Sequence, residues 1–135
     1  MTQIELDTLM KETARDAVQA AKEEFNIELD FSADSIANVD STIMGFVKNF
    51  PSQSLEDKAV FTICNMYGAY LGEVFRSLAG GTWHYDTSTP EAPTILLVVD
   101  DKSYAFAGIC YEKLVKNPDV SVSSYFSQAL GNHTN

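Results

Sequence analysis

Glu73 is the residue whose type and position best suit it to chemistry, because it stands at the edge of an apolar helical face. Arg76 follows three residues later, and residues three apart are neighbours on a helix, so the two side chains are expected to pair. The alternative is that Glu73 faces a pocket between this helix and a sheet. There, burial would suit its carboxylate to acid, base or ligand-binding work. The sequence leaves both interpretations open.

Trp83, His84 and Tyr85 come directly after a glycine pair, at the start of an expected strand. Successive side chains of a strand point to opposite faces, so Trp83 and Tyr85 share one face and His84 takes the other. We expect the aromatic pair to face inward and His84 to be solvated. If His84 turned toward Glu73 instead, carboxylate and imidazole would form a minimal acid and base pair. Asp86 is the other candidate partner of Glu73.

A ligand pocket is the second possibility at this place. Its candidate binding residues come from the helix and from the strand that follows it: Tyr67, Tyr70, Glu73, Arg76, Trp83 and His84. Aromatic residues at helical spacing are also typical of a core. The sequence therefore predicts either a small-molecule pocket or a packed interface at these positions.

Metal ions and other cofactors are not expected. Two histidines, His84 and His133, are the only imidazoles, and no cysteine or histidine spacing resembles a zinc site. The acidic pair at 100–101 is better explained by a hairpin turn than by a calcium loop. Cys64 and Cys110 are too few for a disulfide framework, and Cys64 is expected to be a reduced core residue.

The net charge limits the kinds of partner. Nine Lys and Arg against nineteen Asp and Glu give a net charge of -10, so nucleic acids and anionic membrane surfaces are repelled. A basic protein partner fits this charge, although acidity also serves solubility. No targeting signal or membrane-spanning run is expected, and the cytoplasm is the expected location. A homodimer is a further possibility, because a three-stranded sheet has free edges.

The chain is expected to fold as one α+β domain over residues 1–135, frayed from 130 onward. A long central helix is predicted at Leu55–Ala79, capped by Ser54, because apolar residues spread over most of its circumference. An amphipathic helix opens with a Thr2 and Glu5 capping box and is expected to lie against the glycine side of the central helix. Residues 26–31 form an extended connection or edge strand. A second helix follows from Ser32 or Asp34 and ends at Pro51.

The second half of the chain is predicted to be a small, mostly antiparallel sheet with helical segments after it. Strands are expected at 82–85, 94–99 and 103–107, with the strongly apolar second strand in the middle. A helix is expected at 108–116 and a last one at about 121–130. Three helices around a long central one, followed by sheet and C-terminal helices, is the predicted architecture.

One set of motifs resembles a group of small bacterial proteins of unknown function. These motifs are Leu29-Asp30-Phe31-Ser32, the run 67–74 (YGAYLGEV) with Arg76, and Gly80-Gly81-Thr82-Trp83. The resemblance covers roughly residues 27–85 and implies a bacterial source and one domain. It implies no reaction or cofactor. In type, though not in motif, the chain is also similar to products of mobile gene cassettes.

Two functional hypotheses follow. The first is a non-catalytic binding protein, which holds either a small ligand in a Tyr, Trp and Glu pocket or a basic protein on its acidic surface. The second is a small hydrolase-like enzyme that uses Glu73 with His84 or Asp86.

Overall fold

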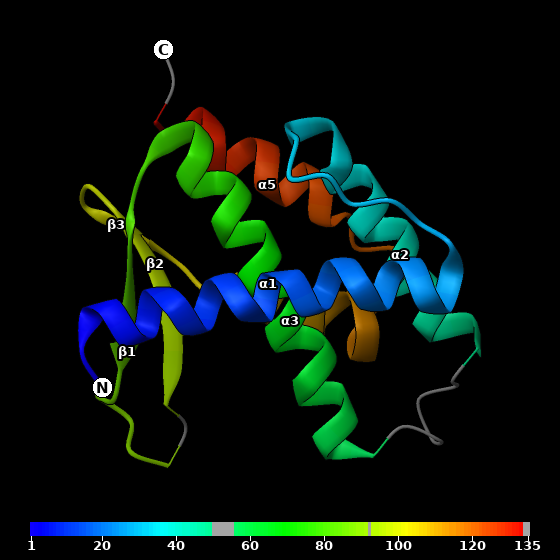
Figure 1. The fold of residues 1–135 in the computed structure, drawn as a ribbon, viewed down its shortest axis with the longest axis horizontal. Helices are drawn as coiled ribbons and strands as arrows, with labels where there is room; N and C mark the ends of the chain where they lie inside the picture. The colour runs from blue at the N-terminus through cyan, green and yellow to red at the C-terminus, as the bar shows by residue number, and fades with distance from the viewer. Residues whose placement is uncertain (50–55, 92, 134–135) are drawn as a thin grey trace.

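The computed structural model describes residues 1–49, 56–91 and 93–133. The elements run in the order α1 (Gln3–Phe25), η1 (Ala33–Ser35), α2 (Ile36–Asn49), α3 (Asp57–Ala79), β1 (Thr82–Asp86), β2 (Thr94–Val99), β3 (Lys102–Tyr104), α4 (Phe106–Tyr111), η2 (Glu112–Lys116) and α5 (Val122–Gly131) (Figure 1). The predicted α+β class is confirmed, with helices first, then a three-stranded antiparallel sheet and further helices.

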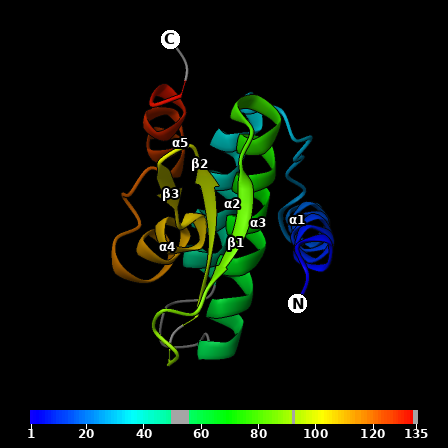
Figure 2. The same ribbon diagram turned by 90° about the vertical axis from the view of Figure 1, so that its left-hand side faces the viewer.

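Helix α3 is the centre of the fold. Its buried residues lie on most of its circumference, as expected of a helix covered by several elements: Ile63, Cys64, Tyr67, Gly68, Ala69, Tyr70, Leu71, Gly72, Val74 and Phe75. Helix α1 lies on one side of it and α4 and α5 on the other (Figure 2). The predicted start at Leu55, the Ser54 cap and the Pro51 stop lie outside the described residues.

Helix α1 forms as its sequence predicts. Thr2 and Glu5 make the reciprocal capping box, and the buried stripe is Leu6, Met10, Ala14, Ala17 and Ala21. The small alanines let α3 come close, so that the Tyr67 hydroxyl donates to the Ala17 carbonyl at 3.0 Å. The connection after α1 is irregular, and of the two alternatives for residues 26–31 it is the non-strand one. Asn26 and Phe31 there have positive φ.

The elements that pack against the glycines of α3 are not the ones expected. A Cβ on Gly72 would lie 2.0 Å from the Trp83 ring, and one on Gly68 would lie 2.6 Å from the Ala107 backbone nitrogen. The prediction that α1 fills the glycine side of α3 is therefore wrong. Strand β1 and helix α4 pack there, because the absent side chains leave room for an indole and a second helix backbone.

The sheet has the order β1-β2-β3, so the apolar strand β2 is the middle one, as predicted. Trp83 pairs with Leu97 and Tyr85 with Ile95, while Leu97 also faces Tyr104 on β3. Strand β3 is shorter than predicted and ends at Tyr104. Helix α4 begins two residues later, because Phe106 packs into the core as a helical residue and not as the end of a strand.

The C-terminal segment packs against the sheet and the core. Helix α5 continues to Gly131, and the His133 side chain is only 5% exposed. Its Nε2 lies 2.7 Å from the Tyr104 hydroxyl, and its ring meets Phe75 edge-on. These contacts place the end of α5 against β3, in the stretch that the sequence analysis expected to fray. Residues 134–135 lie outside the described part.

No helix in the described part of the chain is long and apolar enough to span a membrane.

Candidate functional site

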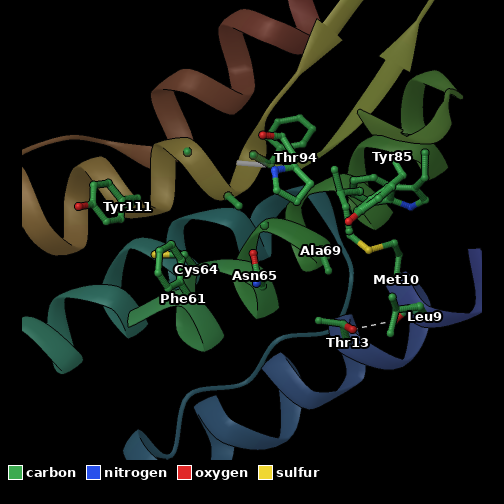
Figure 3. A pocket seen from close by; sticks show the side chains of 17 residues that line it. Leu9, Met10, Thr13, Phe61, Cys64, Asn65, Ala69, Tyr85, Thr94 and Tyr111 are labelled. Carbon is green, nitrogen blue, oxygen red and sulfur yellow. Dashed lines mark hydrogen bonds between the residues drawn. The ribbon is translucent and has the colours of Figure 1, made fainter. Parts of the chain in front are cut away.

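A pocket of about 540 Å³ lies between α1, α3, α4 and the β1-β2 pair (Figure 3). Its lining comes from segments far apart in the sequence: Leu9, Met10, Thr13, Phe61, Cys64, Asn65, Gly68, Ala69, Trp83, Tyr85, Pro93, Thr94, Ile95, Phe106, Ala107, Gly108 and Tyr111. Only folding brings these residues together.

Two helices supply their lining residues with helical spacing. Helix α3 contributes positions 61, 64, 65, 68 and 69, which follow the three- and four-residue steps of one helical face. Helix α1 contributes positions 9, 10 and 13. Because Gly68 and Ala69 have little or no side chain, the wall of α3 recedes there. In Figure 3 Asn65 stands between Tyr111 at one end and Met10 and Tyr85 at the other.

The pocket has a buried floor and an exposed mouth. Trp83, Phe106 and Cys64 are nearly inaccessible and form the floor. Phe61 is 61% exposed and Tyr85 47%, and Leu9 is also exposed at the mouth. Exposed side chains of this size are costly in water unless something covers them. The hollow therefore presents apolar surface at its entrance as well as inside.

Polar groups are few along this lining. None of the described residues that line the pocket is charged. Asn65 is exposed, and among the described contacts its amide makes no hydrogen bond. The Thr13 hydroxyl donates back to the Leu9 carbonyl at 2.7 Å. Asn65 is thus the polar group best placed to hold a ligand atom.

Cys64 offers a thiol and not a thiolate. Burial raises the pKa of Cys64 to about 11. Burial also raises the pKa of Cys110, with the nearby Cys64 as the next cause. A thiol that keeps its proton at neutral pH is a poor nucleophile. Both cysteines are free and buried, as the sequence predicted for Cys64.

Glu73 pairs with Arg76, as the first of the two sequence interpretations expected. Its Oε2 accepts from Arg76 Nη1 at 3.0 Å and from the Trp83 indole Nε1 at 2.8 Å. Arg76 Nε also donates to the Gly81 carbonyl at 3.2 Å. The carboxylate therefore joins α3 to β1 behind the pocket, and neither Glu73 nor Arg76 lines it.

Tyr67 and Tyr70 are core residues, so of the two alternatives left open for them the structure has the packed core and not the pocket. Each is completely inaccessible. The Tyr70 hydroxyl accepts from the Phe31 backbone N–H at 2.8 Å and shares a hydrogen bond with Ser35 at 2.6 Å. Burial raises the pKa of both phenols. The physical reason is that α1, η1 and the 26–31 connection cover this side of α3 and satisfy both hydroxyls.

His84 lies where the alternation of β1 predicts. It is exposed, on the opposite face from Trp83, and lines a separate shallow hollow of about 330 Å³ with the first residues of α1. Asp86 is on the same face, and hydrogen bonds from Ser88, followed by the nearby His84, lower its pKa. Tyr85 shares the face of Trp83, as predicted, and lines the pocket with it, but it stays half exposed whereas Trp83 is buried.

The structure thus brings one of the six predicted site residues, Trp83, into the pocket. In the described part of the chain, no group of three or more His, Cys, Asp or Glu residues could hold a metal ion. The sequence analysis missed Phe61, Asn65 and Tyr111. A clue existed for two of them, because Phe61 and Asn65 lie on the same helical face as Gly68, where a small residue marks a hollow or a close neighbour.

Comparison with known proteins gives no match from which a function could be taken. No family model matches the chain, and searches of curated proteins and of solved structures find no significant match. The resemblance to small bacterial proteins therefore stays a prediction, and any function must be argued from the pocket itself.

Proposed function

We propose that this protein is a non-catalytic binding protein that holds a small, largely apolar molecule in the pocket between α1, α3, α4 and the sheet. The observation that carries the proposal is an apolar hollow of about 540 Å³ with exposed Phe61 and Tyr85 at its mouth. Small-molecule sites typically measure about 300 to 1,000 Å³ and combine apolar walls with a few polar groups. The Asn65 amide is such a polar group here.

A reaction at this site is less well supported than binding. The described lining carries no carboxylate, imidazole or ammonium group to move a proton, and the Cys64 thiol keeps its proton at neutral pH. The Glu73 carboxylate already accepts hydrogen bonds from Trp83 and Arg76, and His84 is on the other face of β1. A basic protein partner and a homodimer remain predictions from the charge and from the sheet edges.

The single tryptophan of the chain allows a direct test, because Trp83 lies in the pocket floor. We expect a neutral phenylbutyl alcohol to change Trp83 fluorescence in a saturable way. Asn65→Phe should abolish that change by filling the pocket from an exposed position. Ser77→Phe is the matched control, because it adds the same ring to an exposed residue of α3 that does not line the pocket.

Two results would contradict this proposal. One is a Trp83 signal that does not respond to the alcohol in the unmodified protein. The other is equal binding by Asn65→Phe, since the probe would then bind elsewhere. Circular dichroism of both variants checks that each remains folded.

A further inference from the structure

We propose that the ligand of this pocket is a hydrophobic organic cation, namely an apolar or aromatic body that carries one ammonium or quaternary ammonium group. This inference rests on the proposed function and names its ligand class. Three observations carry it: the aromatic composition of the lining, the position of Glu73 behind Trp83, and the sign of the charge around the pocket.

Five aromatic side chains from three elements line the pocket: Phe61 of α3, Trp83 and Tyr85 of β1, and Phe106 and Tyr111 of α4. The face of an aromatic ring carries partial negative charge and attracts cations, tryptophan most strongly. Aromatic cages recognise quaternary ammonium ligands through this attraction. One ring already has such a neighbour, because Lys116 Nζ lies 6.0 Å from the Tyr111 centroid.

Glu73 strengthens the cation-binding character of Trp83. The indole N–H donates to the Glu73 carboxylate at 2.8 Å, and a donor bonded to an anion shifts electron density toward the ring. The Glu73 carboxylate lies outside the pocket, so it acts on the indole ring without contacting the ligand. Arg76 shares the same oxygen at 3.0 Å and offsets part of the effect.

The charge around the pocket favours a cation over an anion. No described lining residue is charged, and the Lys116 ammonium, 6.0 Å from the centroid of the Tyr111 ring, opposes a cation only at that end of the pocket. The whole chain has a net charge of -10, and such a field raises the local concentration of cations. The charges next to lining positions in sequence are mixed: Glu12 beside Thr13 and Glu112 beside Tyr111 are acidic, whereas Lys11 beside Met10 is basic and Lys116 pairs with Glu112 at 3.4 Å, so the preference for a cation comes from the field of the whole chain. Lys58, one turn before Phe61, is the nearest opposing charge along α3.

Three probes that share one apolar body test the inference: a phenylbutyl chain that ends in trimethylammonium, in a hydroxyl or in a carboxylate. Trp83 fluorescence is titrated with each probe at low and at high salt. We expect the cation to bind at least about fivefold more tightly than the alcohol, which in turn binds more tightly than the carboxylate. Raising the salt concentration should narrow the gap between cation and alcohol, because screening weakens the field of the protein.

Two variants test whether the cation is bound by the faces of aromatic rings or only by apolar surface. Phe61→Leu and Tyr85→Leu keep an apolar side chain at two exposed positions, where the cost to folding is small. Each should lower the affinity for the cation about threefold or more, while the affinity for the alcohol changes less than twofold. Asn65→Phe should abolish the binding of both probes.

The outcomes distinguish this inference from the proposed function. Equal affinity for cation and alcohol, both lost in Asn65→Phe, would overturn the cation inference and leave the pocket as a binding site. If the carboxylate probe bound more tightly than the cation, the cation inference would also be overturned. A cation that still binds Asn65→Phe would show attraction to the acidic surface and also overturn the inference. If no probe bound at all, the proposed function itself would fail.

Discussion

The Glu73 carboxylate holds β1 against α3 through a single oxygen that accepts from both Trp83 and Arg76. Its side chain is only 12% exposed, so the bonds are largely shielded from water. Glu73→Ala would leave the buried indole N–H without an acceptor, and an unsatisfied buried donor costs about 1–3 kcal/mol. We expect Glu73→Ala to lower the unfolding free energy by that amount in urea denaturation.

Glu73→Gln is the informative companion variant, because its amide oxygen can still accept from the Trp83 indole. We expect it to fold and to lose less than half as much stability as Glu73→Ala. Glu12→Ala, at an exposed position of α1 with no described side-chain bond, serves as the control and should change little. An equal loss in Glu73→Gln and Glu73→Ala would contradict the assignment of a hydrogen-bond acceptor at this position.

At the scale of elements, Gly72 sets how closely β1 can approach α3. A Cβ at this position would lie 2.0 Å from the Trp83 ring, closer than any real contact, so the indole would have to move. We expect Gly72→Ala to lower the unfolding free energy by about 1–3 kcal/mol and to shift Trp83 fluorescence. Gly131→Ala is the matched control, because open space surrounds that glycine and alanine favours a helix. Unchanged stability in Gly72→Ala would contradict the packing described.

A second link between elements joins α2, η2 and α5. Asp40 of α2 accepts from the backbone N–H groups of Val122 and Ser123 at 2.7 and 2.9 Å, which caps the N-terminus of α5. The buried Lys113 ammonium lies 3.6 Å from the same carboxylate and donates to the Pro118 and Val120 carbonyls, each at 2.7 Å. One carboxylate thus positions a helix and balances a buried charge.

We expect Asp40→Ala to lower the unfolding free energy by about 2–4 kcal/mol, because the cap is lost and Lys113 stays buried without its counter-ion. In the same variant, amide hydrogen exchange in α5 should become faster. The control is Glu112→Ala, which breaks an exposed pair with Lys116 and should cost less than about 0.5 kcal/mol. Equal effects of the two variants would contradict the role given to Asp40.

At the scale of the whole molecule, the elements could be predicted from the sequence and the pocket could not. Apolar periodicity, caps and glycine turns are local, so the helices and the order of the strands follow from them. The pocket combines residues from five separate segments, and each of these residues resembles an ordinary core or surface position. Tyr70 and Trp83 show the difficulty. Both are buried aromatic residues, and only their neighbours, Ser35 for Tyr70 and Gly72 for Trp83, decide which one reaches a hollow.

The stability of the whole molecule should fall in alkali. Burial raises the pKa of Cys64 from 9.0 to about 11, and it also raises the pKa of Cys110 and of Tyr67. The unfolded chain therefore releases these protons at a lower pH than the folded chain does. The contribution of Cys64 to stability is complete below pH 9 and is lost as the pH rises toward about 11.

Cys64→Ser removes one of these groups, so its unfolding free energy should fall less steeply over the same pH range. The expected difference in slope is up to about 1.4 kcal/mol per pH unit. Urea denaturation at a series of pH values measures it, and only the slopes are compared, because the substitution itself changes packing. Parallel slopes for the two proteins would contradict burial of a protonated thiol.

The central claim is that ligands enter the pocket between α1, α3, α4 and the sheet, and amide shifts in two-dimensional NMR test it most directly. On titration with the neutral phenylbutyl alcohol, we expect the shifted resonances to cluster at residues 9–13, 61–69, 83–85, 93–95 and 106–111, while α5 and the middle of α2 stay unchanged. Shifts that cluster on α2 and α5, or that spread evenly over the acidic surface, would contradict the account.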